Sequence, residues 1–118
     1  MKYRQTHQVP QTDSGYLASK LASLLQDYSG VIIKQYSSYQ TIQVNSARVL
    51  RIWYISPRTA RLEVISAIHG LLQDKLFGWE ESNLATKHYT HQCPIKLDYE
   101  PALIADAVVR MFKLVPKY

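Results

Sequence analysis

Two of the chain's four histidines lie beside its only cysteine, in the stretch KHYTHQC at residues 87–93. Imidazole nitrogens and thiolate sulfurs are the ligands that zinc prefers in proteins. A histidine beside a cysteine can also activate the sulfur as a nucleophile. The residue types alone therefore indicate a metal protein or a small hydrolase. The spacing of the histidines and the cysteine distinguishes these functions from a purely structural role for the same residues.

The spacing argues against a metal site. The stretch has the alternation of a β-strand, in which His88 and His91 point to opposite faces of the sheet. Only His91 and Cys93 share a face, and two ligands fall short of the three or four that zinc requires unless His7 or His69 folds nearby. We therefore predict that the protein holds no metal and no cofactor.

Cys93 is also poorly placed for nucleophilic catalysis. Catalytic cysteines usually lie at a helix N-terminus or a strained turn, whereas Cys93 precedes Pro94 within an apolar row. The chain has four glycines and neither a phosphate-cradling glycine loop nor a Gly-x-Ser-x-Gly elbow. We therefore favour a protein that is not an enzyme. The inward row of the strand is predicted to be Tyr89, His91, Cys93 and Ile95.

The composition predicts a single domain spanning residues 1–118. Hydrophobic residues make up 47% of the chain and charged residues 19%, which suits a domain that buries a core without disulfides. One cysteine, no secretory leader and no long apolar run lead us to expect a soluble cytoplasmic protein without a membrane partner. The formal charge is +5, and four arginines fall within residues 48–61. The basic character is therefore local.

Two segments have the spacing of amphipathic helices. Residues 13–28 carry regularly spaced leucines, with N-cap candidates at residues 12–14 and Gly30 just past the end. Residues 100–115 have Pro101 in the first turn and one apolar stripe. Because each helix has a single apolar stripe, we expect both to pack on one face of a sheet.

The apolar period changes to two between residues 31 and 65, which predicts a meander of four antiparallel strands. Residues 86–97 predict a later strand of the same sheet, and residues 66–79 a short helix or an irregular lid. The expected fold class is α+β, with an antiparallel sheet and two helices on one face. Polar breaks divide the meander at residues 37–38, 45–47 and 57–59.

The register of the meander follows from requiring one consistently apolar face. A two-residue turn places Ile33 opposite Ile42. A three-residue loop at the next break places Ile42 opposite Leu50, and another at the last break places Ile52 opposite Val64. The predicted core face is Val31, Ile33, Ile42, Val44, Leu50, Ile52, Tyr54, Leu62 and Val64.

The opposite face of the meander is aromatic and basic, unlike the charged surface of a solvated sheet. If both helices pack on the core face, this outward face is left uncovered, so it is our candidate binding site. Its proposed binding residues are Lys34, Tyr36, Tyr39, Arg51, Trp53 and Arg61. Its remaining predicted members are Ile32, Thr41, Gln43, Val49, Ile55, Glu63 and Ile65.

Three interpretations of this face are open. Trp, Tyr and Arg are favoured in the cores of protein interfaces, which indicates a homodimer or another protein partner. Aromatic rings could instead stack on unpaired bases while the basic side chains bind phosphates of single-stranded nucleic acid. In the third interpretation, residues 66–79 fold over the face through Leu71, Leu72, Leu76, Phe77 and Trp79.

A family resemblance bears on this choice. The order of RVLRIWYISPRTARLEVIS, an intervening lid and KHYTHQCPIKLDYEPALIADAVVRMF resembles a small uncharacterised domain of bacterial restriction and other DNA-associated proteins. The resemblance implies a basic hairpin, a strand and a closing helix, and it lends no catalytic residues. We predict a non-enzymatic intracellular binding module that acts through self-association or a protein partner. Nucleic-acid binding is the alternative, and a small hydrolase or metal protein comes third.

Overall fold

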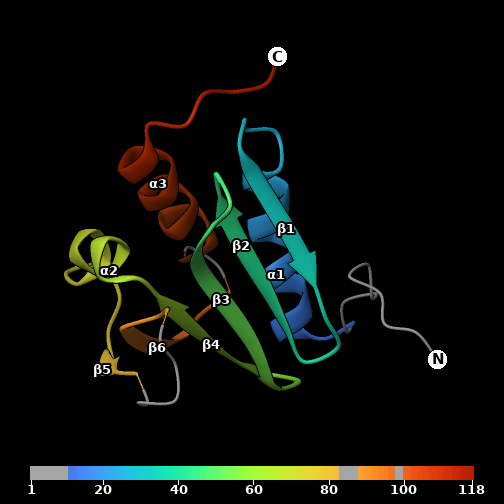
Figure 1. The fold of residues 1–118 in the computed structure, drawn as a ribbon. Helices are drawn as coiled ribbons and strands as arrows, with labels where there is room; N and C mark the ends of the chain where they lie inside the picture. The colour runs from blue at the N-terminus through green and yellow to red at the C-terminus, as the bar shows by residue number, and fades with distance from the viewer. Residues whose placement is uncertain (1–10, 83–87, 98–99) are drawn as a thin grey trace.

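The computed structural model describes residues 11–82, 88–97 and 100–118. In these residues the chain forms a six-stranded antiparallel sheet with three helices (Figure 1), which confirms the predicted α+β class. The elements in chain order are α1 (Asp13–Leu25), β1 (Val31–Gln35), β2 (Tyr39–Val44), β3 (Ala47–Ser56), β4 (Thr59–Val64), α2 (Ser66–Leu72), β5 (Glu80–Glu81), β6 (His91–Ile95) and α3 (Glu100–Phe112).

The strands lie in the order β1-β2-β3-β4-β6-β5. The predicted meander is present as β1 to β4, and the later strand joins it by pairing antiparallel with β4. β6 begins only at His91, and residues 86–87 of the predicted strand lie outside the described residues. A two-residue strand that the sequence did not predict, β5, pairs with β6 and forms one edge of the sheet.

The first two predicted pairings are confirmed, although the loop that produces the second pairing differs from the predicted one. Ile33 lies opposite Ile42, and Ile42 lies opposite Leu50. The connection from β2 to β3 is a two-residue turn whose residues Asn45 and Ser46 have φ angles of 51° and 73°. Such turns match the twist of antiparallel strands. A β-bulge then leaves Val49 as the extra residue and restores the predicted pairing.

The predicted register between β3 and β4 is wrong by two residues. Ile52 lies opposite Leu62 instead of Val64, because residues 57–58 form a two-residue turn and Ile55 is left over as a bulge. Proline fixes its φ near about −65°, which excludes the primed turn types that suit a tight hairpin. The bulge at Ile55 accommodates that turn, and a shift of two residues leaves the paired side chains of β3 and β4 on their predicted faces.

The two long helices are shorter than predicted. Thr12 caps α1, and its hydroxyl oxygen accepts a hydrogen bond from the Gly15 backbone N–H at 3.2 Å. The helix ends at Leu25, three residues before the predicted end. α3 ends at Phe112 because the next residue, Lys113, has a φ of 51°, the left-handed conformation that terminates helices.

The helices and one face of the sheet enclose an aliphatic core. α1 contacts α3, β3 and β4, and α2 contacts α3 and β4. Burying one large aliphatic side chain stabilises the fold by about 1.5–3 kcal/mol. Gln40 is the polar side chain in this face, and its amide donates a hydrogen bond to the Ala18 carbonyl of α1 at 3.1 Å. The largest buried side chains are Leu17, Leu21, Leu25, Ile42, Leu50, Ile52, Leu62, Ile68, Leu72, Leu76 and Ile104.

The segment after β4 does not cover the outward face. Leu72 and Leu76 are buried in the core, and α2 lies beside α3 (Figure 1). Phe77 is 79% exposed, and Trp79 packs edge-on against His69 of α2. The interpretation in which residues 66–79 cover that face is therefore wrong. None of the helices in the described part of the chain has the length and apolar character of a membrane span.

Candidate binding face

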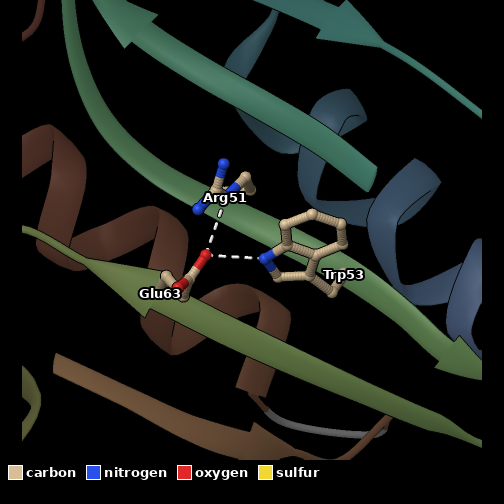
Figure 2. Close-up of polar contacts among 3 residues, drawn as sticks. All are labelled: Arg51, Trp53 and Glu63. Carbon is tan, nitrogen blue, oxygen red and sulfur yellow. Dashed lines mark hydrogen bonds and ion pairs between the residues drawn. The ribbon is translucent and has the colours of Figure 1, made fainter. Parts of the chain in front are cut away.

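The outer face is the face of the sheet turned away from α1 and α3. Figure 2 shows Arg51, Trp53 and Glu63 standing on this face, with the two helices behind the strands. The register explains their proximity, since Arg51 of β3 lies directly opposite Glu63 of β4. Trp53, two residues further along β3, points to the same side and lies between Tyr39 of β2 and Arg61 of β4.

Glu63 joins two donors of the outer face. Its Oε1 accepts a hydrogen bond from Arg51 Nε at 2.7 Å and another from Trp53 Nε1 at 2.6 Å (Figure 2). The Glu63 side chain is 6% exposed and that of Arg51 19%, so the ion pair is largely shielded from water. Charge-assisted hydrogen bonds of this kind are short and directional. The carboxylate therefore fixes both the guanidinium and the indole.

Aromatic rings surround the Arg51 guanidinium. Its central carbon lies 4.7 Å from the Trp53 ring centre, 5.4 Å from that of Tyr39 and 4.8 Å from that of Tyr89. Tyr39 also packs against Trp53 at 4.7 Å and stacks on Tyr36 at 4.8 Å. The resulting Arg51 cluster comprises Tyr36, Tyr39, Arg51, Trp53, Glu63 and Tyr89.

Four of the six predicted binding residues meet in this cluster: Tyr36, Tyr39, Arg51 and Trp53. Lys34 lies opposite Thr41, and Arg61 lies opposite Trp53, which puts both on the outer face. Among the described residues, neither takes part in the hydrogen bonds or ring contacts of the cluster. They contribute positive charge beside it, and Arg61 is exposed.

Two members of the cluster were not among the predicted binding residues. Glu63 was placed on the correct face, but its role as an acceptor was missed. The available signal was that Glu63 is the carboxylate of an otherwise basic face; the predicted register did not place it opposite Arg51, where the structure has it. Tyr89 was predicted in the inward row of β6, which is wrong: the strand begins at His91, so its alternation does not extend to residue 89. Burial raises the pKa of Tyr89, against a smaller lowering by Arg51.

The apolar residues of the outer face divide into buried and exposed groups. Val49 was predicted to face outward, but it is the bulge residue and is fully buried. Ile32 and Ile55 remain 44% and 47% exposed. These two isoleucines are uncovered apolar area that a partner could bury.

The histidines form a separate cluster around β6. His69 of α2 does lie beside His91, with ring centres 3.6 Å apart and planes inclined by 2°. The two rings are stacked face to face, and His88 is exposed and takes no part. In the described ranges, no group of three or more His, Cys, Asp or Glu side chains is placed to hold a metal ion. His7 lies outside the described residues.

Cys93 has the environment of a core residue. It is 2% exposed, and burial, with a smaller effect of the Glu100 charge, raises the pKa of the thiol to about 12. The thiolate, which is the nucleophilic form, is therefore disfavoured at neutral pH. This arrangement gives no support to a Cys-His nucleophilic pair. Comparisons of the chain with protein-family models, with curated proteins and with solved structures returned no match.

Proposed function

We propose that the outer face is a protein-binding surface and that its first partner is a second copy of the chain. The observation that carries this proposal is the Arg51 cluster, in which Glu63 holds Arg51 and Trp53 in place on a face that no helix of the described residues covers. Trp, Tyr and Arg are the residues that most often dominate binding energy at interface centres. The cluster combines all three types.

The arrangement suits a protein partner because it is already ordered. Side chains that must be immobilised on binding reduce affinity, and the hydrogen bonds of Glu63 remove much of that cost for Arg51 and Trp53. The exposed side chains of Ile32 and Ile55 add apolar area, which a protein surface can bury and base stacking does not require. A self-complementary contact between two copies uses each of these features twice.

The mass of the protein in solution, measured by sedimentation over a concentration series, tests this proposal. Replacing Trp53 with Glu puts an unpaired charge at the centre of the face, so the dimer should dissociate. We expect the dissociation constant to rise about 30-fold or more, equivalent to about 2 kcal/mol. Tyr16→Glu, at an exposed position of α1, is the matched control and should leave association unchanged.

A second variant separates binding from folding, since Trp53 also donates a hydrogen bond to Glu63. Ile55→Glu adds the same charge at a bulge residue that is already exposed, and it leaves the bonds of the Arg51 cluster intact. It should weaken association without changing the melting temperature. A wild-type protein that stays monomeric at about 100 µM would contradict self-association.

Binding of single-stranded nucleic acid is the second candidate, favoured by the partly exposed side chains of Tyr39 and Trp53 on a face that also carries Lys34 and Arg61. Because Glu63 neutralises Arg51, contacts to phosphate fall to Lys34 and Arg61. Under this alternative, Trp53→Ala costs about 1–3 kcal/mol of oligonucleotide affinity with little change in salt dependence. Arg61→Ala reduces the salt slope by about one phosphate contact. No binding at about 50 mM salt excludes it.

A further inference from the structure

A cavity of about 410 Å³ lies away from the Arg51 cluster, between the segment after α2, the end of β6 and the first turn of α3. β5 pairs with His91 and Gln92, and among the described residues no strand pairs with Pro94 and Ile95 on that side of β6. The cavity opens beside this unpaired end of the strand. Its volume falls within the range of about 300–1,000 Å³ that is usual for small-molecule sites.

The apolar part of the cavity is formed by Phe77, Pro94, Ile95 and Leu103. Phe77 is 79% exposed, which is unusual for a ring of this size. The next residue, Gly78, has a φ of +86°, and a Cβ there would lie 3.2 Å from the Pro94 ring. Glycine therefore permits the close approach that places Phe77 at the rim. The Phe77 ring therefore lines the cavity and is mostly exposed.

The charged part of the cavity is mostly basic. Lys75 and Lys96 reach it from different segments, and both are exposed. The one carboxyl group of the lining is Glu100, whose Oε2 is buried without a hydrogen-bond partner among the described residues. Burial raises the pKa of Glu100, against a smaller lowering by Lys96. The two ammonium groups, next to the apolar part of the lining, suit an anionic group.

We propose that this cavity binds a small amphipathic anion, a carboxylate or sulfonate attached to an aromatic or short aliphatic body. The body lies against Phe77 and Leu103, and the anionic group lies between Lys75 and Lys96. The site is independent of the outer face and does not rest on the function proposed for it.

Two fluorescent probes that share one ring system test the proposal. 1-Anilinonaphthalene-8-sulfonate carries the anion, and N-phenyl-1-naphthylamine lacks it. The wild-type protein should bind the sulfonate saturably at one site and bind the neutral probe about tenfold or more weakly, which is the contribution of the charge. Replacing Lys75 and Lys96 together with Gln should abolish that difference. Lys20→Gln, an exposed lysine of α1, is the matched control and should preserve it.

Phe77→Ser should weaken binding of both probes, because it removes apolar surface and no charge. These changes are at exposed positions, so an unchanged melting curve will separate lost binding from lost folding. Failure of the wild type to bind the sulfonate saturably at about 1 mM would overturn the site. So would binding that survives the double lysine replacement but is lost in Ile55→Glu, because the probe would then occupy the outer face.

Discussion

The two faces of the sheet are built from alternate residues of the same strands, yet they are held together in different ways. On the helix side, aliphatic residues such as Ile52 and Leu62 pack against α1 and belong to the same core cluster as the buried residues of α3. On the outer face, their neighbours Arg51, Trp53 and Glu63 are joined by two hydrogen bonds to a single carboxylate oxygen. The stability of the helix side depends on how well apolar side chains fill the core volume. The stability of the outer face depends on the direction of the hydrogen bonds to Glu63.

This difference determines how each face responds to substitution. Apolar packing is non-directional, so removing carbon atoms costs the lost contacts and the cavity that remains. A directional network instead leaves donors without acceptors when one partner is removed, and a buried unsatisfied donor is costly by itself. The same sheet therefore offers a matched test of two kinds of stabilisation.

The largest effect is expected on the helix side. Leu62→Ala removes a fully buried side chain at the centre of β4, and the free energy of unfolding should fall by about 2–5 kcal/mol. Urea denaturation measures this change. Arg61→Ala, at the preceding exposed position, is the control and should change stability by less than about 0.5 kcal/mol. Equal losses in the two variants would show that Leu62 does not lie in the core.

The next effect concerns the outer face. Glu63→Ala leaves Arg51 Nε and Trp53 Nε1 without their acceptor, so we expect a loss of about 2–3 kcal/mol in urea denaturation. The loss should be smaller than that of a fully buried ion pair because Arg51 is 19% exposed. Trp53 fluorescence should shift as the indole loses its partner.

A double replacement sharpens this second prediction. Arg51→Met with Glu63→Met removes both charges while keeping much of the volume, so it should recover a large part of the stability lost in Glu63→Ala. Thr41→Ala, a neighbouring outer-face residue that has no bond to Glu63, is the control for position. If the double variant is less stable than Glu63→Ala, the directional network contributes net stability beyond neutralising its own charges.

The comparison also explains what the sequence could predict of the fold. Apolar alternation selects which side chains share a face, and it correctly gave the pairing of Ile33 with Ile42 and of Ile42 with Leu50. It cannot detect a shift of two residues, because the faces repeat with the same period. The pairing of Ile52 with Leu62 depends instead on the turn at Pro57 and the bulge at Ile55. Backbone geometry, not hydrophobicity, decides that register.

The candidate site shows the same limit. Strand alternation alone assigns a residue to a face of the sheet, so the sequence was sufficient to place Tyr39, Arg51 and Trp53 on the same face. It did not predict that Glu63 is buried, since a carboxylate beside arginines looks like a solvated charge in a sequence. Its burial depends on packing around Arg51, to which Tyr89 contributes from a segment far along the chain. The contact between Tyr89 and Arg51 cannot be predicted from the alternation of apolar residues, because it joins two segments that are far apart in the sequence.

The smallest expected effect lies at the edge of the helix side, where His69 of α2 stacks on His91 of β6. Burial, and to a smaller extent the charge of His91, lowers the pKa of His69 below its ordinary value of 6.5. Between the two pKa values, the unfolded chain therefore binds more protons at this residue than the folded chain does. Stability from this group should be present above pH 6.5 and be lost as the pH falls from that value through the lower pKa of the folded state.

Replacing His69 with Phe keeps an aromatic ring against His91 but removes the proton site. Wild type and variant are compared by urea denaturation at about pH 7.5 and about pH 5.5, the range in which histidine titrates. The wild type should lose more stability between these values than His69→Phe, while the exposed control His88→Gln should follow the wild type. The difference is small because His69 lies near the surface, where solvent screens its charge. Parallel profiles for wild type and His69→Phe would mean that the stack does not discriminate between the two protonation states.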